Sequence, residues 1–518
     1  MSSQLSLAQL AHSSRFKRKS PAYEYDSYAD EYHALYGQNK PKSPIAITSA
    51  ADEDAEFMAD YDRLMHNRDE IKAEHANKDF EAISGHSLDR ILQCMRHVRE
   101  SLKTDPRDQG KVIYPIDLVL MVILLARICG CISAPSIARY YKDHYLELQQ
   151  WLPDIPPPNR MISRSTINTV MRMFSEEEIQ ELLTLYFSSP AASVQELSQC
   201  DEQRERPDGL RDTCGLDGQE MRSSFVRGVA SRKRKGAHGV TLFNCTTKTI
   251  LRSHTVAKKN QETNALLQML PNLSVHGKVV MADALNSGVK VSTAIIAHGA
   301  HFLLGMKANA GNSELSDHIG AIFAREAAKP EGMREWLVAE FTEKGHGRIE
   351  RGVIELLPSS KLDPRIKNPH PEVKSIVRYT KYCTYLNNGE VVKETASERY
   401  FICSLEFSEQ TLIQVKYSIL DYWGIETHHG ILDDPRVFNQ DAVQGCNPNF
   451  LSNTLGINKI ALNVLTSVRH FEAKRHSSNN LMSFAETQQF LSQRSVAFQL
   501  WHLVRCFNSD LLSSEGET

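Results

Sequence analysis

Apolar residues recur every three or four positions from about residue 87 of this chain, a spacing typical of amphipathic helices. The longest apolar run, residues 116–132, holds only Asp117 and Arg127 as charged side chains and indicates a buried helix. Further helices are predicted over residues 137–145, 166–174 and 176–187. The pattern therefore predicts an all-helical domain over residues 86–190, followed by a polar linker over residues 191–212.

From Thr213 the pattern changes to short β-type runs that alternate with helices. The predicted strands are residues 240–245, 250–256, 278–283, 301–306 and 400–405. The predicted helices are residues 262–270, 291–297, 409–429, 458–471 and 487–507. Strands that alternate with helices are typical of an α/β sheet. We therefore predict an α/β domain over residues 213–475 and a C-terminal helix within residues 476–518.

Two stretches of the chain depart from these patterns. Residues of about 310–397 are more polar and mixed, with β-prone pieces at 349–356 and 375–384, and they are predicted as a partly β insertion in the α/β domain. Residues 1–85 show no periodicity and mix tyrosines with acidic residues, which favours a flexible polar tail.

Composition narrows the class of protein. Hydrophobic residues make up 41% and charged residues 24% of the chain, which excludes a wholly disordered or fibrous protein. The net charge of −3 argues against a histone-like DNA binder. The start of the chain lacks the apolar core of a signal peptide, and the apolar run is shorter than the roughly 20 residues that a membrane-spanning helix needs. Together with ten scattered cysteines, these features predict a protein of a reducing compartment without a membrane partner.

Three acidic residues stand where a carboxylate is costly. Asp217 and Asp283 each follow a predicted strand, and open α/β sheets bind ligands at the carboxyl ends of their strands. In the helix predicted over residues 409–429, the apolar seam lands next on Glu426 and places it on the buried side. A desolvated carboxylate must be compensated by a cationic side chain, a hydrogen-bond donor or a metal ion. Three carboxylates that converge on one place suit Mg²⁺ or Mn²⁺. The alternative is that each acid only caps a strand or pairs with an arginine.

A basic segment begins directly after the first of these acids. Residues 222–259 contain ten Lys or Arg residues and no Asp or Glu. The ten are Arg222, Arg227, Arg232, Lys233, Arg234, Lys235, Lys248, Arg252, Lys258 and Lys259. A polyanion held by this segment would pass close to Asp217, which favours nucleic-acid binding. The alternative is a solvent-exposed loop, because a short charged run such as residues 232–235 is common in such loops.

Eight short motifs occur along the chain in the order of a known family. They are DPR at residues 105–107 with the apolar helix that ends CGC at 129–131, LDGQEMRSS at 216–224, KNQE at 259–262, MADA at 281–284, LGMKAN at 304–309, GHGRIE at 345–350, RYFICSL at 399–405 and WGIE at 423–426. In this order they resemble the DDE transposases of the ISAs type, the H-repeat-associated proteins carried by bacterial insertion sequences. The resemblance covers roughly residues 100–475.

The resemblance implies a ribonuclease H-like catalytic core in which Asp217, Asp283 and Glu426 bind metal. It implies two Mg²⁺ or Mn²⁺ ions, with Asp217 bridging both, and a phosphoryl transfer that cuts and joins DNA at the ends of an insertion sequence. The implied partners are double-stranded DNA and a second copy of the chain in a DNA-bound homodimer, in the bacterial cytoplasm at the nucleoid. The residues expected to bind DNA are Arg222, Arg232, Lys233, Arg234, Lys235, Lys259 and Lys307.

Recognition of the DNA ends is expected away from the three acids. Arg160, Arg164 and Arg172 surround a predicted capped helix in the helical domain, a placement that suits end binding. Ordinary helix packing is the alternative interpretation of this region.

The chain departs from the family pattern near the expected site. Gln219 stands for the usual lysine, and Thr427 stands for an asparagine. Leu420 and Tyr422 occupy places where the family tends to have Arg and His. None of these changes removes an expected metal ligand. The sequence therefore leaves open an active transposase, a catalytically weakened or inactive DNA-binding protein descended from one, and a nuclease that cuts without joining.

The basic segment generates a first prediction. Replacing Arg232, Lys233, Arg234 and Lys235 together by Ser should weaken binding to all DNA sequences alike. The dependence of binding on salt should flatten by roughly 0.9 in log–log slope for each phosphate that the variant no longer neutralises. Titrations at several salt concentrations, on terminal and on random DNA, measure both effects. If the variant kept the salt dependence of the unsubstituted protein but no longer distinguished terminal from random DNA, the segment would instead be reading bases.

Overall fold

The computed structural model describes the chain from residue 105 to residue 505 with interruptions, together with Arg96, Arg99 and Glu100. The interruptions are residues 108, 153–154, 157–159, 188–205, 225–235, 257–260, 274, 308–312, 346–347, 366–367, 388–389, 446 and 477–479. The predicted tail over residues 1–85 lies outside the described residues. So do four expected DNA-binding residues of the run 232–235 and Lys259.

Helices fill the described chain ahead of the sheet, as the periodicity predicts. They are α4 (Ile116–Ile128), α5 (Ala134–Asp143), α6 (Tyr145–Trp151), α7 (Arg164–Met173) and α8 (Glu176–Phe187), after a short 3-10 turn η1 (Gln109–Lys111). Every residue of α4 is buried, which confirms the prediction of a buried helix in residues 116–132. Helix α7 begins where the Ser163 side chain accepts a hydrogen bond from the Thr166 backbone.

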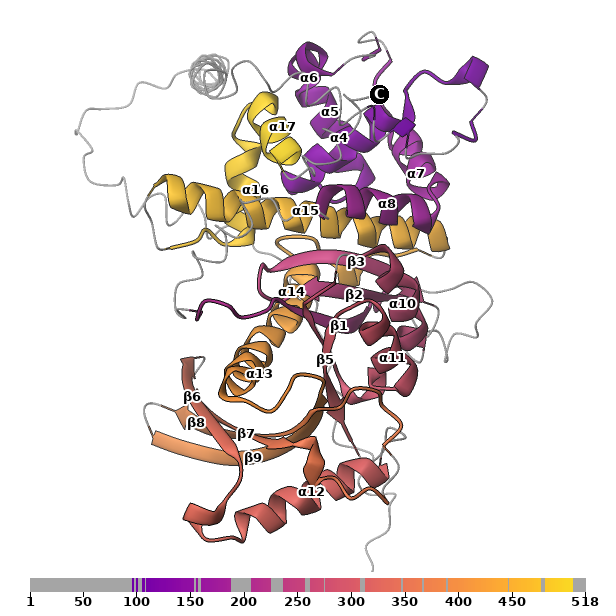
Figure 1. Cartoon of the computed structure of the whole chain (residues 1–518). Coiled ribbons are helices and arrows are strands. Elements are labelled where there is room, and N and C mark those ends of the chain that lie inside the picture. The colour runs from indigo at the N-terminus through magenta and orange to yellow at the C-terminus, as the bar shows by residue number, and fades with distance from the viewer. Residues whose placement is uncertain are drawn as a thin grey trace, which may run out of the picture. The chain divides into compact units, whose positions relative to one another are not determined.

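A nine-stranded sheet follows, with the order β3-β2-β1-β4-β5-β9-β8-β7-β6 (Figure 1). Its strands are β1 (Thr213–Glu220), β2 (His238–Asn244), β3 (Thr249–Val256), β4 (Val279–Ala282), β5 (His301–Met306), β6 (Leu337–Gly345), β7 (Arg348–Pro358), β8 (Ser375–Asn387) and β9 (Glu390–Cys403). Strands β1, β4 and β5 run parallel, whereas β2, β3 and β9 pair antiparallel with their neighbours. The predicted α/β class is confirmed at this level.

Both faces of the central strands are covered. Alternate residues of β4 point to opposite faces, so Val280 and Ala282 join one apolar core while Val279 and Met281 join another. The first core includes residues of α10 (Glu262–Met269), α11 (Val289–Ala297) and α12 (Ser313–Ala327). The second includes residues of α13 (Glu409–Tyr422). The short 3-10 turns of this region are η3 (Leu270–Asn272), η4 (Ala284–Asn286), η5 (Glu331–Met333) and η6 (Ser359–Lys361).

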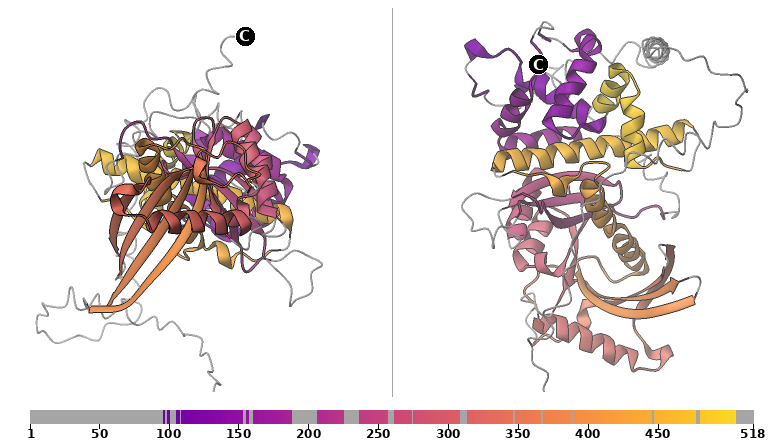
Figure 2. Two further views of the ribbon diagram at one scale, coloured as in Figure 1. Left: turned by 60° about the horizontal axis from the view of Figure 1, so that its bottom comes forward. Right: turned by 180° about the vertical axis from the view of Figure 1, so that it is seen from behind.

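The region predicted as an insertion, about 310–397, extends the same sheet. The β-prone pieces at 349–356 and 375–384 lie in β7 and β8, and β9 joins the group to β5. Strand β6, helix α12 and the outer part of β9 escaped prediction. Strand β9 is exposed from Glu390 to Arg399, so it has no apolar alternation from which the sequence could reveal it. The long strands β8 and β9 run outward together in Figure 2.

The helix predicted over residues 409–429 is two helices. Helix α13 ends at Tyr422 and α14 (Gly424–Asp433) begins two residues later, with Trp423 between them. The predicted burial of Glu426 is wrong, because this residue is exposed on α14.

The C-terminal helices pack with those from the start of the described chain. Helix α15 (Pro448–Arg475) is far longer than the predicted helix over 458–471, and the predicted single helix over 487–507 is two helices, α16 (Phe484–Ser492) and α17 (Val496–Arg505). One apolar core joins residues of α15, α16 and α17 to those of α4, α5, α7 and α8 (Figure 1). The helical layer is therefore built from both ends of the described chain.

Polar contacts fix α15 to the edge of the sheet. Asn463 accepts a hydrogen bond from the Ile250 backbone nitrogen at 2.9 Å and donates one to the Ile250 carbonyl at 3.0 Å. The buried Lys459 amine donates to Thr241 Oγ1 at 2.8 Å and Ser253 Oγ at 2.6 Å. Burial lowers the pKa of Lys459 to about 7, against an opposing effect of the Glu176 charge.

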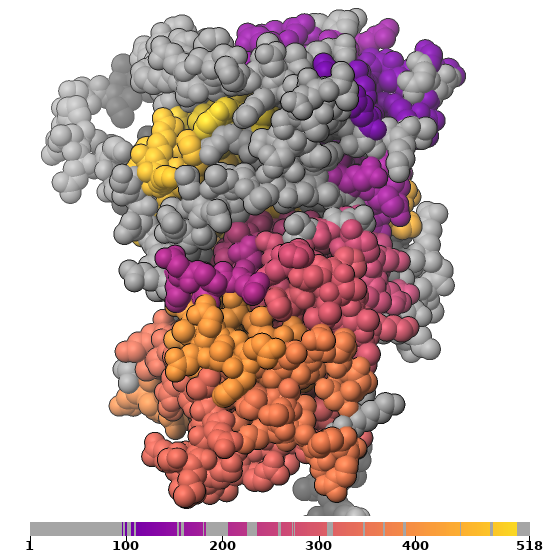
Figure 3. All heavy atoms as spheres, viewed as in Figure 1, coloured from indigo at the N-terminus to yellow at the C-terminus, as the bar shows by residue number. Residues whose placement is uncertain are grey.

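The segment that leads into β1 lies on the surface against α13 (Figure 3). Arg206 forms an ion pair with Asp421 near the end of α13. Gln414 accepts from the Arg211 backbone nitrogen at 2.7 Å and donates to the Arg211 carbonyl at 3.0 Å. These contacts set where β1 begins relative to the helix that precedes Glu426.

A second prediction concerns Lys459. Because its folded-state pKa lies below the unfolded value, the unfolded chain binds more protons above about pH 7, and stability should rise with pH in that window. We expect Lys459→Met to lose this rise, by up to about 2 kcal/mol between pH 7 and pH 9. Urea unfolding of both proteins across this range measures the difference. An identical pH dependence in the two proteins would contradict the expectation.

Candidate active site

Asp217 and Asp283 leave neighbouring parallel strands at the same level. The β1–β4 ladder ends with the pair Leu216 and Ala282, so the two aspartates are the next residues on their strands. Asp217 does not end its strand as predicted, because β1 continues to Glu220 through pairing with β2. The expected placement at the edge of the parallel ladder nevertheless holds for both residues.

The Asp217 carboxylate lies in a desolvated and negatively charged setting. Burial raises its pKa to about 6, a hydrogen bond from the Gly218 backbone opposes the rise, and the charges of Asp283, Glu262 and Glu426 add to it. The Gly218 nitrogen donates to Asp217 Oδ1 at 2.8 Å. His429 Nδ1 lies 3.6 Å from Asp217 Oδ2. The cost of ionising Asp217 therefore falls when a cation approaches.

Asp283 caps the short turn that follows β4. Its Oδ1 accepts hydrogen bonds from the Asn286 backbone at 3.2 Å and from the Asn286 side chain at 3.1 Å. The Ser287 hydroxyl donates to the Asp283 carbonyl at 2.6 Å. The side chain is thereby held at the carboxyl end of β4 with its second oxygen, Oδ2, outside these bonds.

A buried carboxylate that sequence reasoning left unassigned supports the two aspartates. Glu262, in the first turn of α10, accepts from Asn286 Nδ2 at 2.6 Å and lies 2.6 Å from His238 Nε2. A Cβ atom on Gly218 would lie 2.2 Å from His238 Nε2 and 2.4 Å from Glu262 Oε1, so only glycine lets β1 cross this pair. The KNQE motif and the glycine after Asp217 were the signals that could have revealed the network.

Glu426 reaches the site from α14 as an exposed residue. Partial burial raises its pKa, while the charges of Arg399 and Lys381 oppose the rise. One phenol near the end of α13 is affected by all three acids. Burial raises the pKa of Tyr422 well above its usual value, and the charges of Asp217, Asp283 and Glu426 raise it further. The Tyr422 phenol thus responds to the charge of all three predicted acids.

Two of the departures from the family pattern hold these helices against β1. The Tyr422 hydroxyl donates to the Leu216 carbonyl at 3.0 Å, one residue before Asp217. Gln219 Nε2 donates to the His429 carbonyl at 3.0 Å and to Asp433 Oδ2 at 2.7 Å. Both substitutions therefore carry structural contacts that position α13 and α14.

The two histidines that follow Glu426 are largely shielded from solvent. Burial lowers the pKa of His429 to about 3, with the positive charges of Lys459 and His238 adding to the effect and Glu262 opposing it. Burial likewise lowers the pKa of His428 well below its usual value. Both imidazoles are therefore neutral at neutral pH.

Among the described residues, no group of three or more His, Cys, Asp or Glu side chains is arranged closely enough to hold a metal ion. The three acids influence one another's charge without sharing ligand distances. Their oxygen donors are the right chemistry for Mg²⁺ or Mn²⁺. None of the helices in the described ranges is long and apolar enough to cross a membrane.

The described cations expected to bind DNA are exposed. Arg222 follows β1, and its guanidinium lies 3.3 Å from Asp441 Oδ2 with its side chain 79% exposed. Lys307 is exposed and directly follows β5, three residues after the last pair of the β4–β5 ladder. Both therefore face solvent on the side of the sheet where the strands β1, β4 and β5 end.

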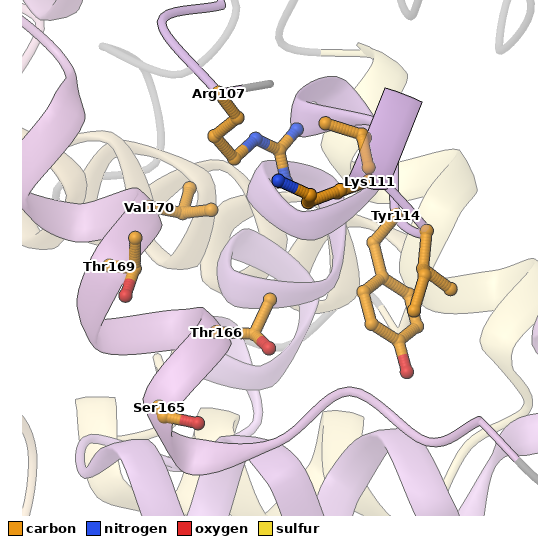
Figure 4. Close-up of a pocket in the computed structure, with 9 residues that line it drawn as sticks. Arg107, Lys111, Tyr114, Ser165, Thr166, Thr169 and Val170 are labelled. Carbon is orange, nitrogen blue, oxygen red and sulfur yellow. The ribbon is translucent and has the colours of Figure 1, made fainter. Parts of the chain in front are cut away.

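The helical region carries a shallow pocket beside the predicted end-binding arginines. It has a volume of about 300 Å³ and lies between the segment before α4 and the first turns of α7 (Figure 4). Its lining combines two cations with hydroxyl and apolar groups: Arg107, Lys111, Val112, Ile113, Tyr114, Ser165, Thr166, Thr169 and Val170. Arg160, Arg164 and Arg172 are exposed around the same helix.

Comparison with known proteins places this site in a family. The chain matches the family described as DDE_Tnp_1-associated over residues 101–187 and the family described as Transposase DDE domain over residues 212–464. The two matches together cover more than half of the chain, in the expected order. The chain belongs to the DDE transposases.

Relatives agree with the resemblance seen in the sequence. "H repeat-associated putative transposase YhhI" of Escherichia coli K12 is 23% identical over 393 residues, covering 74% of this chain and 93% of the relative. "Putative transposase YncI" of Escherichia coli O157:H7 is 24% identical over 382 residues, covering 70% and 85%. The cryo-EM structure of a piggyBac transposase synaptic complex with hairpin DNA aligns over 84% of this chain and 80% of that chain, at 9% identity with a TM-score of 0.32, a likeness too low to carry an argument. The resemblance to the H-repeat-associated transposases is confirmed.

A third prediction follows from the electrostatics of Asp217. The folded-state pKa of Asp217 is raised to about 6. The native state therefore binds more protons than the unfolded state from about pH 4 to pH 6, and stability falls as the pH rises through this range. Above it, the ionised Asp217 carboxylate destabilises the folded protein. Asp217→Asn should therefore stabilise the metal-free protein at pH 7.5. Allowing for the 33% exposure of the side chain, we expect about 1 kcal/mol, or a few degrees in Tm.

The control is an aspartate whose partners stabilise its charge. Asp212 Oδ2 accepts from Lys278 Nζ at 2.7 Å, so Asp212→Asn should lower Tm. Thermal melts at pH 4.5 and pH 7.5 compare the two variants with the unsubstituted protein. A loss of stability in Asp217→Asn at pH 7.5 would contradict a repulsive setting.

Proposed function

We propose that this protein is a transposase that catalyses metal-dependent cleavage and strand transfer of DNA at the ends of an insertion sequence. The observation that carries the proposal is the setting of Tyr422, whose hydroxyl binds β1 next to Asp217 while the charges of Asp217, Asp283 and Glu426 all act on it. Three acids from distant parts of the sequence whose charges act on one partly buried phenol fit a single reaction centre. Membership of the DDE transposases supports this chemistry.

The central sheet supports a ribonuclease H-like core. Strands β1, β2 and β3 form an antiparallel meander, and β4 and β5 add in parallel on the other side of β1. In this arrangement β1 is central and its neighbour β4 follows a crossover. We assign residues 213–475 to this core, with β6, β7, β8 and α12 as the insertion, and propose that helices α4 to α8 form an associated end-binding domain.

Asp217, Asp283 and Glu426 would hold two Mg²⁺ or Mn²⁺ ions, since their oxygen donors fit these hard cations. Bound metal would supply charge stabilisation for the phosphoryl group and a more acidic water. The chain's own residues prepare this site. Asn286 orients the Asp283 carboxylate, and the Glu262–His238 pair supports β1 beneath Gly218. Neutral His429 adds no positive charge that would compete with a cation at Asp217.

DNA is the proposed partner. Arg222 and Lys307, exposed near Asp217 and Asp283, are proposed to hold phosphates next to the scissile bond. The basic run at residues 232–235 and Lys259 are proposed to hold the backbone farther away. The exposed arginines around α7 and the cationic pocket beside it are proposed to bind the DNA ends. A homodimer would present one site to each end.

A second function, that of a DNA-binding protein descended from a transposase, is favoured by the departures from the family pattern at Gln219 and Tyr422. Their contacts nevertheless tie α14 and α13 to β1. Cleavage and strand-transfer assays with Mg²⁺ on the terminal sequences that flank the gene separate the two functions. Cleavage without joining would identify a nuclease.

A fourth prediction tests the proposed reaction. Asp283→Asn should abolish Mg²⁺-dependent DNA cleavage and leave DNA binding nearly intact, because it removes a ligand charge while its amide oxygen can still accept the bonds from Asn286. Cleavage and binding are measured on the same terminal duplex. Asp317→Asn, at an exposed position on α12, serves as the control and should leave both unchanged. Cleavage by Asp283→Asn at the unsubstituted rate would place the activity elsewhere.

A further inference from the structure

The outer part of β9 carries different chemistry on its two faces. Every residue from Glu390 to Arg399 is exposed, and side chains alternate between the faces of a strand. One face presents Lys393, Thr395, Ser397 and Arg399, and the other presents Glu394, Ala396 and Glu398. Cations and hydroxyls therefore gather on one side of an exposed strand and carboxylates on the other.

The cations continue across the neighbouring strands. Residues directly opposite each other in antiparallel strands point to the same face, so the pairs of Ser397 with Lys381 and of Tyr385 with Arg348 extend the first face. Lys393 lies opposite Tyr385, with its amine 5.8 Å from the centre of the ring. We call Arg348, Lys381, Lys393 and Arg399 together the cationic face.

Part of this charge is not neutralised within the sheet. Lys381 and Arg348 share the carboxylate of Glu350, at 2.6 and 2.5 Å. Among the described residues, Lys393 and Arg399 have no carboxylate within ion-pair distance, and both are exposed. The face therefore keeps positive charge available to a partner.

The cationic face ends at the candidate active site. The amine of Lys381 lies 4.6 Å from the centre of the Trp423 ring, and the guanidinium carbon of Arg399 lies 5.4 Å from it. Trp423 precedes Glu426 by three residues, so the two side chains are neighbours on one face of the helix start. Stacking on the Trp423 indole holds Lys381 and Arg399 near Glu426. The neutral indole does not cancel their positive charges.

We propose that the cationic face binds the phosphate backbone of DNA and leads it along β8 and β9 to Glu426. This inference rests on the proposed function and adds its substrate path. A cluster of acids repels a polyanion, so a DNA strand can approach Glu426 only where cations offset that repulsion. The hydroxyls of Thr395 and Ser397 supply further donors to phosphate oxygens between the cations.

The test uses the full chain and a fluorescent duplex of about 30 base pairs. The double variant Lys393→Gln/Arg399→Gln should weaken binding roughly tenfold near physiological salt and lower the log–log salt slope by roughly 0.9 for each phosphate that it no longer neutralises. The matched control is Lys344→Gln/Arg351→Gln, which removes the same charge from the opposite face of the same sheet. The control should bind with the affinity and salt slope of the unsubstituted chain. Equal effects of the two variants would overturn the proposal.

A charge-preserving variant separates phosphate binding from side-chain shape. Lys393→Arg/Arg399→Lys keeps both charges and should restore the salt slope, whereas a decrease as large as that of the Gln variant would overturn the proposed binding to phosphate. A labelling experiment on the unsubstituted chain tests the proposal even if a variant fails to fold. On DNA, Lys393 should be protected from an amine-reactive reagent more than Lys344 is, and equal protection of the two lysines would overturn the proposal.

The outcomes also distinguish this inference from the function on which it rests. An unsubstituted chain that binds no DNA contradicts both. If the unsubstituted chain binds and cleaves DNA but the Gln variant does so equally well, the transposase proposal stands and the cationic face is not its DNA path.

Discussion

Parallel pairing between β1 and β4 ends at Leu216 and Ala282, so Asp217 and Asp283 follow the last pair of this ladder and carry like charges. Ionising both in a desolvated place is unfavourable, and the raised pKa of Asp217 expresses that cost. The structure must hold the pair together against this repulsion and leave room for a cation that relieves it. Much of the surrounding architecture can be understood from this one constraint.

Support comes from beneath and from beside the pair. Beneath it, Glu262 is satisfied by His238 and Asn286, and Asn286 also binds Asp283, so a buried network fixes both β1 and the end of β4. Beside it, Tyr422 and Gln219 tie α13 and α14 to β1. Helix α15 fixes β2 and β3 through Lys459 and the backbone bonds of Asn463. The two aspartates are thus flanked by hydrogen-bond donors and by the neutral His429 imidazole.

The same constraint bears on the approach of substrate. Acids that repel one another also repel DNA, so the cations must lie around the site and not within it. The described cations follow this rule: Arg222 and Lys307 are exposed after their strands, and Lys381 and Arg399 stack on Trp423 beside Glu426. The insertion between β5 and α13 therefore brings positive charge to the glutamate, which the sequence placed on the buried face of a helix.

The sequence by itself determined the alternation of helices and strands, the buried helix α4, the family, and the position of Asp283 directly after a strand. These features depend on local periodicity and on short motifs, which a single chain displays. Only the tertiary structure decided that β1 continues past Asp217, that Glu426 is exposed, that α15, α16 and α17 pack with the first helices, and that Glu262 supports Asp283 through Asn286. The outer part of β9 also needed its partner, because its charged faces show no apolar pattern and only the register with β8 defines it. Each of these features depends on contacts between residues far apart in the chain, and such contacts leave no periodic signal in the segments that make them.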